Sequence, residues 1–140
     1  MQQNYNYPYG YNNSQQKPEK IKLAIKLLYI SLIITFVHGV INLFQIKDGN
    51  TMIFSLLIFI FVLGMELVLI YFITKANNTA RIIYTILMAV GTLFLLPALY
   101  YFSIPEIIYN IGFVGLNIFI IVLLFHPTSS NWFRMGRFNY

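Results

Sequence analysis

The sequence predicts an all-helical membrane protein whose four transmembrane helices form an up-down-up-down antiparallel bundle. Hydrophobic residues make up 59% of the 140 residues and charged residues only 9%, whereas a soluble domain usually carries about 25% charged residues. The apolar residues fall into four long blocks at about 21–46, 51–74, 79–101 and 104–125. Each block reaches the roughly 20 residues that a helix needs to cross the hydrocarbon core of a bilayer. The blocks do not alternate strictly between apolar and polar residues, which excludes a membrane β-barrel.

Turn and capping residues separate the four blocks. Pro18 precedes the first block, and proline is tolerated in a first helical turn. Residues 48–51 (DGNT) and 77–79 (NNT) each predict a turn followed by a helix N-cap. Residues 103–106 (SIPE) have the spacing of a capping box with proline in the first turn, and Pro127 ends the fourth helix. Because the links are short, we expect sequential helices to be antiparallel neighbours.

The basic residues predict the orientation of the helices. Lys47 lies alone between the first two blocks, and the link between the last two blocks has no basic residue. The other eight basic residues all fall on the opposite side of the predicted bundle: Lys17, Lys20, Lys22, Lys26, Lys75, Arg81, Arg134 and Arg137. Because cytoplasmic segments of membrane proteins carry the excess of Lys and Arg, both termini are predicted to be cytoplasmic.

Three regions are expected along the chain. Residues 1–19 are rich in Gln, Asn and Tyr and predict a disordered cytoplasmic tail, which is either a sticky interaction segment or a solvated leader. Residues 20–126 form the four-helix transmembrane domain. Residues 127–140 predict a cytoplasmic tail at the membrane interface, with too few arginines to bind nucleic acid. Its expected interfacial anchors are Trp132, Arg134 and Arg137.

Each apolar block carries polar residues along one side. We expect these sides to meet inside the bundle, away from lipid, and the glycines of the blocks to allow close approach of neighbouring helices. In chain order, the polar positions are Ser31, Thr35, His38, Asn42, Gln45, Ser55, Glu66, Arg81, Thr85, Thr92, Glu106, Asn110 and Asn117.

Glu66 and His38 are the titratable residues deepest in the predicted spans. Glu66 lies about 12 Å from the cytoplasmic end of the second helix at 1.5 Å per residue, where a charge costs on the order of 3 kcal/mol or more. It is either a proton- or cation-coupling site or a protonated structural residue. His38 is either a packing residue or part of a water relay, since about 12 Å of helical rise separates it from Glu66.

Arg81 has two interpretations, and catalytic signals are weak. Arg81 either reaches from the third helix to pair with Glu66 or marks the inner membrane interface. The sequence has no cysteine, no metal-ligand cluster, no nucleophile motif and no phosphate loop. We therefore predict no catalytic residue, no metal site and no cofactor.

Two short stretches resemble a group of small uncharacterised bacterial four-helix inner-membrane proteins. They are residues 77–83 (NNTARII) and residues 124–133 (LFHPTSSNWF), and the resemblance covers residues 17–133. It implies a bacterial plasma membrane and brings no agreed activity. The group usually has Trp where this chain has Thr79. Small multidrug transporters are similar in size, but their essential Glu lies in the first helix and Glu66 lies in the second, so their function is not carried over.

These observations favour a non-catalytic membrane protein that acts through contacts with a partner in the membrane. An accessory subunit or an immunity-type protein would fit, with the lipid bilayer and a membrane protein or a second copy as partners and no nucleic acid. The alternative is a small proton- or cation-coupled transporter or channel subunit that uses Glu66. An enzyme would require several ionisable groups at one depth, and the sequence does not supply them.

Overall fold

The computed structural model describes residues 17–98, 100 and 102–136, and the part of the chain that it describes is helical. Its helices are α1 (Glu19–Gln45), α2 (Gly49–Thr74), α3 (Asn78–Ala98), α4 (Ile104–Phe125) and α5 (Pro127–Gly136). The first four are long and apolar enough to cross a membrane, which confirms the predicted helical class and number of candidate spans. The predicted disordered tail, up to residue 16, and Arg137 lie outside the described residues.

Side-chain caps set the helix starts close to the predicted positions. Asp48 caps α2 by accepting hydrogen bonds from the Thr51 hydroxyl at 2.5 Å and the Thr51 backbone N–H at 2.8 Å. The N-cap is thus Asp48, and α2 begins two residues before the predicted 51. These hydrogen bonds hold the pKa of the Asp48 carboxyl below its usual range. At α4, the Glu106 carboxylate accepts hydrogen bonds from the Ser103 N–H and hydroxyl at 2.7 Å each, as expected for a capping box.

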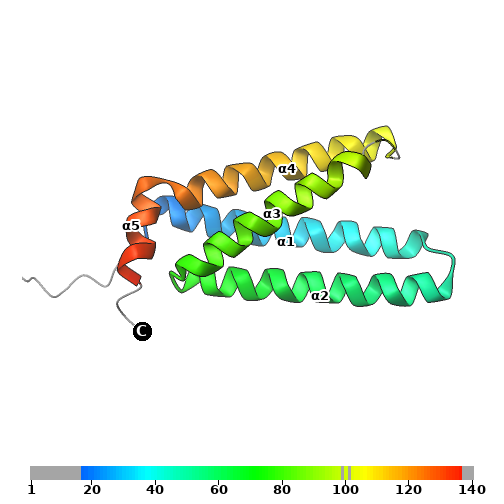
Figure 1. Cartoon of the computed structure of the whole chain (residues 1–140), viewed down its shortest axis with the longest axis horizontal. Helices are drawn as coiled ribbons and strands as arrows, with labels where there is room; N and C mark the ends of the chain where they lie inside the picture. Colours follow the sequence, from blue (N-terminus) through cyan, green and yellow to red (C-terminus); the bar gives the residue numbers. More distant parts are fainter. Residues whose placement is uncertain (1–16, 99, 101, 137–140) are drawn as a thin grey trace, which may run out of the picture.

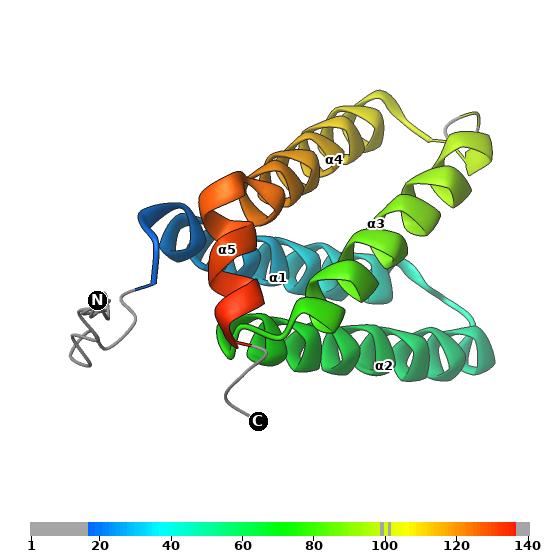
Figure 2. The ribbon, with the colours of Figure 1, turned by 60° about the vertical axis from the view of Figure 1, so that its left-hand side comes forward.

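α5 is a helix that we did not expect from the sequence. Pro127 ends α4 as predicted, and the same residue opens α5, where its missing N–H costs nothing. α5 has only 10 residues, too few for a stable isolated helix. It lies across one end of the bundle, against α4 and α1 (Figure 2). Tertiary packing therefore stabilises α5, and a local sequence pattern does not reveal it.

The four long helices do not pack evenly along their length. α1 lies beside both α2 and α4, while α3 runs obliquely between α2 and α4 (Figure 1). We call the end that carries α5 the closed end; it comprises residues 17–31, 66–84 and 117–136. The remaining described residues, 32–65, 85–98, 100 and 102–116, form the open end.

Every buried hydrophobic residue of the described chain lies at the closed end. The core combines the start of α1, the end of α2, the start of α3, the end of α4, and α5. Its members are Ile21, Ala24, Leu28, Leu69, Ile70, Ile73, Ala80, Tyr84, Ile120, Leu123, Leu124, Trp132 and Phe133. At the open end, many large apolar side chains are exposed on the outside of the helices, where lipid can surround them.

Candidate functional site

Buried polar residues form a layer where the closed end meets the open end. Each of the four long helices contributes to it: Ser31 from α1, Glu66 from α2, Tyr84 from α3 and Asn117 from α4. All four side chains are at most 5% exposed. Thr35 lies one turn beyond Ser31 on α1 and is half-buried. We call these five residues the polar layer.

The α3–α4 side of the polar layer is hydrogen-bonded. The Tyr84 hydroxyl donates to Asn117 Oδ1 at 2.6 Å, which joins α3 to α4. Asn117 Nδ2 donates to the Phe113 carbonyl one turn earlier at 2.9 Å. The buried amide therefore has both of its polar atoms engaged, as buried polar groups normally do.

The α1–α2 side of the polar layer is not satisfied. Glu66 Oε1, Ser31 Oγ and Thr35 Oγ1 are buried and have no hydrogen-bond partner. An unmade hydrogen bond to a buried polar group costs about 1–3 kcal/mol. The three atoms are covered by protein, so solvent does not compensate them. Glu66 is thus a buried residue whose carboxyl group has an unsatisfied oxygen.

The polar stripe of α1 leaves the interior beyond the polar layer. His38 is half-buried, and its ring stacks on that of Tyr109 from α4 with centroids 3.9 Å apart. Asn42 and Gln45 are exposed, so the prediction that the whole stripe faces the interior is wrong for these residues. The physical reason is that the open end has no packed core to receive them. The ring partner of His38 is thus Tyr109, and Glu66 Oε1 accepts no hydrogen bond from His38.

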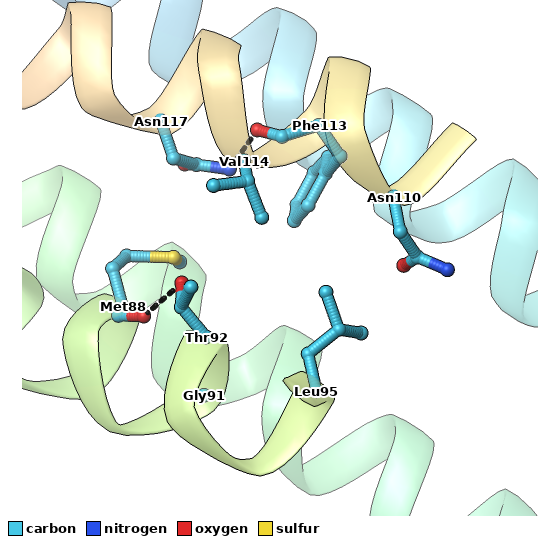
Figure 3. A pocket seen from close by; sticks show the side chains of 8 residues that line it. All are labelled: Met88, Gly91, Thr92, Leu95, Asn110, Phe113, Val114 and Asn117. Carbon is cyan, nitrogen blue, oxygen red and sulfur yellow. Dashed lines mark hydrogen bonds between the residues drawn. The ribbon is translucent and has the colours of Figure 1, made fainter. Parts of the chain in front are cut away.

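A groove lies between α3 and α4 at the open end (Figure 3). Its volume is about 210 Å³, and both polar and apolar side chains line it. The Thr92 hydroxyl donates to the Met88 carbonyl at 2.8 Å. Asn110 Nδ2 donates to the Glu106 carbonyl at 2.8 Å. This leaves Asn110 Oδ1 turned toward the groove, without a partner in the described chain (Figure 3).

The glycines of the spans do not pack helices of this chain against one another, except at Gly39. A Cβ atom at Gly39 would meet the Phe59 ring of α2. Cβ atoms at Gly64, Gly91, Gly112 and Gly115 would meet no atom within 4 Å. The expected close approach within the bundle is therefore wrong for these four residues. Gly91 lines the α3–α4 groove instead.

Arg81 does not pair with Glu66. Its Nη1 donates to the Leu124 carbonyl at 3.0 Å and to the Ser130 hydroxyl at 3.2 Å. The guanidinium carbon lies over two aromatic rings, 4.4 Å from the Phe125 centroid and 4.6 Å from the Phe133 centroid. The ion pair found in the described chain joins Lys22 to Glu19 at the surface instead. Arg81 therefore holds the end of α4 to α5, which neither interpretation from the sequence had included.

The expected interfacial anchors occupy different environments. Trp132 is only 9% exposed and packs edge-on against Phe133, so its ring belongs to the protein core and is not free to lie among lipid headgroups. Arg134 is exposed beside Arg81 on a shared pocket. The sequence did not show whether the Trp132 ring packs in the core or lies at the membrane interface, because both roles suit an aromatic residue shortly after an apolar span.

Two residues important to these sites were absent from our predictions. Tyr84 is apolar enough to pass as a core residue, although a buried tyrosine usually finds a hydrogen-bond partner. Ser130 follows Pro127 in a segment that we expected to be a tail. The signal for Tyr84 was its spacing of three from Arg81, a predicted polar position of the third helix.

The polar residues described above do not assemble a metal site. No group of three or more His, Asp or Glu residues that could hold a metal ion occurs among the residues with described structure.

Comparison with known proteins found no matching family model, curated protein or solved structure. The resemblance to small bacterial four-helix membrane proteins therefore stays a prediction, and the molecule is a multi-pass membrane protein by its four candidate spans.

Proposed function

We propose that the chain crosses a bacterial plasma membrane four times, up-down-up-down, with both termini in the cytoplasm. The distribution of charge supports this orientation. Lys20, Lys75 and Arg134 lie at the closed end, as do the other described basic residues apart from Lys47. Since basic residues accumulate on the cytoplasmic side, the closed end faces the cytoplasm and Lys47 the opposite side.

We propose further that the protein is non-catalytic and acts through contacts in the membrane, as an accessory subunit or an immunity-type protein. The observation that carries this proposal is the α3–α4 groove. Asn110 Oδ1 faces the groove and has no partner among the residues that the structure describes, and Gly91 leaves room beside it. In lipid, such an oxygen has no water to bond, and small residues favour close helix approach. The occupant we propose is a transmembrane helix of another membrane protein that offers a hydrogen-bond donor to Asn110.

A transport role is the second candidate, and the unsatisfied polar layer favours it. Glu66 Oε1 lies buried without a partner, as do Ser31 Oγ and Thr35 Oγ1. Ionisable groups inside membranes commonly mark proton or ion pathways. We rank this candidate second because the α3–α4 groove is lined by neither Glu66 nor His38. A pathway would require the α1–α2 side of the layer to open.

The proposal is tested by purifying the tagged full chain from its native membrane in mild detergent. Mass spectrometry identifies the proteins that co-purify and measures the mass of the intact assembly. We expect a stoichiometric membrane-protein partner that is lost from Gly91→Leu, because the larger side chain fills the groove. Gly112→Leu is the matched control, since Gly112 is also uncovered but lies outside the groove. A homo-oligomer without another partner, unaffected by Gly91→Leu, would contradict the proposal.

Glu66→Gln separates the two candidate functions. The substitution keeps the shape of the side chain and removes its ability to exchange a proton. An accessory or immunity-type protein should keep its membrane abundance and its partner. A proton-coupled transporter should keep its abundance and lose flux across proteoliposomes, which a pH-sensitive dye inside the vesicles measures.

A further inference from the structure

We infer that a pocket at the closed end binds a phosphate group, carried by an anionic lipid or free in the cytoplasm. Its volume is about 190 Å³, and we call it the Arg81 pocket. It lies between the start of α3 and α5, two segments that Figure 2 shows next to each other. The residues that line it are Asn78, Arg81, Ser130, Phe133 and Arg134. This site is independent of the α3–α4 groove and of the proposed partner.

Arg81 is the central residue of this pocket because its charge is buried and has no counter-ion among the described residues. The side chain is only 8% exposed. Nη1 is used by the Leu124 carbonyl and the Ser130 hydroxyl, both uncharged. Nε is buried and has no hydrogen-bond partner. Burying a charge is costly unless an opposite charge or several hydrogen bonds compensate it. The pocket thus contains a cation that no acidic residue of the described chain neutralises.

The geometry around Arg81 fixes the guanidinium in place before any ligand binds. Its carbon atom lies over the Phe125 ring at 4.4 Å and over the Phe133 ring at 4.6 Å from the ring centroids. Cation–π contacts of this kind hold the plane of the guanidinium. A planar, immobilised guanidinium is the group that pairs best with phosphate oxygens. The Arg81 side chain is therefore ordered before an anion binds, and binding loses little further side-chain entropy.

The rest of the pocket suits an anion as well. Arg134 adds a second positive charge from α5, and its side chain is exposed and able to move toward a ligand. Asn78 opens α3, and the N-terminus of a 21-residue helix carries partial positive charge. No acidic residue is among the lining residues. Two arginines and the start of α3 thus converge on one small volume.

The place of the pocket makes a lipid phosphate the ligand most easily reached. It lies where the candidate spans α3 and α4 meet the short helix α5, the depth at which headgroups meet a membrane protein. Basic pockets at this depth bind anionic lipid headgroups. Free phosphate has the same oxygen chemistry, so the experiment compares the two sources directly.

Trp132 provides the measurement, because it is the one tryptophan of the chain and packs against Phe133 in the pocket wall. The full chain in detergent is titrated with short-chain phosphatidylglycerol, short-chain phosphatidylcholine and inorganic phosphate, and Trp132 fluorescence is followed. We expect saturable binding of phosphatidylglycerol and little response to phosphatidylcholine. Arg134→Gln should weaken binding about fivefold, the effect of one basic residue near a charged surface. Lys75→Gln is the matched control, since Lys75 is also an exposed cation of the closed end but does not line the pocket.

Arg81 also stabilises the fold, so the test uses one variant that keeps its charge and one variant at an exposed residue of the pocket. Arg81→Lys keeps the charge and loses the fork of donors, so it should weaken binding more than Arg134→Gln. Arg134→Gln alters an exposed residue and tests the site without touching the core. If inorganic phosphate competes as well as the lipid does, the ligand is a soluble phosphate. The inference is overturned if Lys75→Gln weakens binding as much as Arg134→Gln, or if phosphatidylcholine binds equally well.

Discussion

The closed end and the open end consist of the same four helices, yet only the closed end has a protein core. Phe133 is fully buried at the closed end, whereas Phe61 is 70% exposed at the open end. The two ends have similarly apolar helices, so hydrophobicity does not decide which residues are buried. Lipid solvates apolar side chains as well as a protein interior does. Burial instead depends on where helices converge, and α5 covers the end where they do.

The largest expected effect is the loss of the Phe133 ring. Phe133→Ala should lower the free energy of unfolding by about 3–5 kcal/mol, because it removes a fully buried aromatic ring from the core and leaves a cavity among its neighbours. Phe61→Ala should change it by no more than about 0.5 kcal/mol, since that ring contacts lipid or detergent. Unfolding of both variants in detergent by increasing SDS, followed by circular dichroism, gives the two values. Equal losses would mean that the two ends do not differ in packing.

A smaller effect is expected at the boundary between the two ends. Tyr84→Phe removes the hydroxyl that donates to Asn117 Oδ1 and should cost about 1 kcal/mol, the size of a hydrogen bond within a membrane protein. Tyr29→Phe is the matched control, because Tyr29 is at the same end but 45% exposed. The same SDS titration measures both. A loss for Tyr29→Phe as large as for Tyr84→Phe would show that the Tyr84–Asn117 bond adds no stability.

The smallest effect is expected within the open end and has the opposite sign. Gly91→Ala should raise the free energy of unfolding by about 0.5–1 kcal/mol, because alanine favours a helix over glycine and its Cβ meets no atom within 4 Å. Gly39→Ala should gain less, since the Phe59 ring must move to admit the new methyl group. Thermal unfolding of the two variants in one detergent makes the comparison. A destabilised Gly91→Ala variant would show that α3 packs more tightly there.

Most of the secondary structure could be predicted because it depends on local chemistry. Long apolar blocks require helices in lipid, and the sequence predicted α4 at its observed bounds of 104 and 125. Capping residues such as Ser103 and Glu106 interact across three positions of the sequence, so their spacing predicted the start of α4. α5 was missed because a 10-residue helix depends on contacts that lie far away in the sequence.

The sequence predicted which polar residues lie in the spans, but it did not predict which residues they contact. The sequence alone determined that Glu66, Arg81, Asn110 and Asn117 lie in or near apolar spans, since a polar residue in an apolar block is visible by inspection. Only the tertiary structure decided that Arg81 bonds α4 and α5 and does not meet Glu66. The physical reason is that lipid imposes helices but not their crossing angles. Side-chain packing at the closed end sets those angles, and with them the polar layer, the α3–α4 groove and the Arg81 pocket.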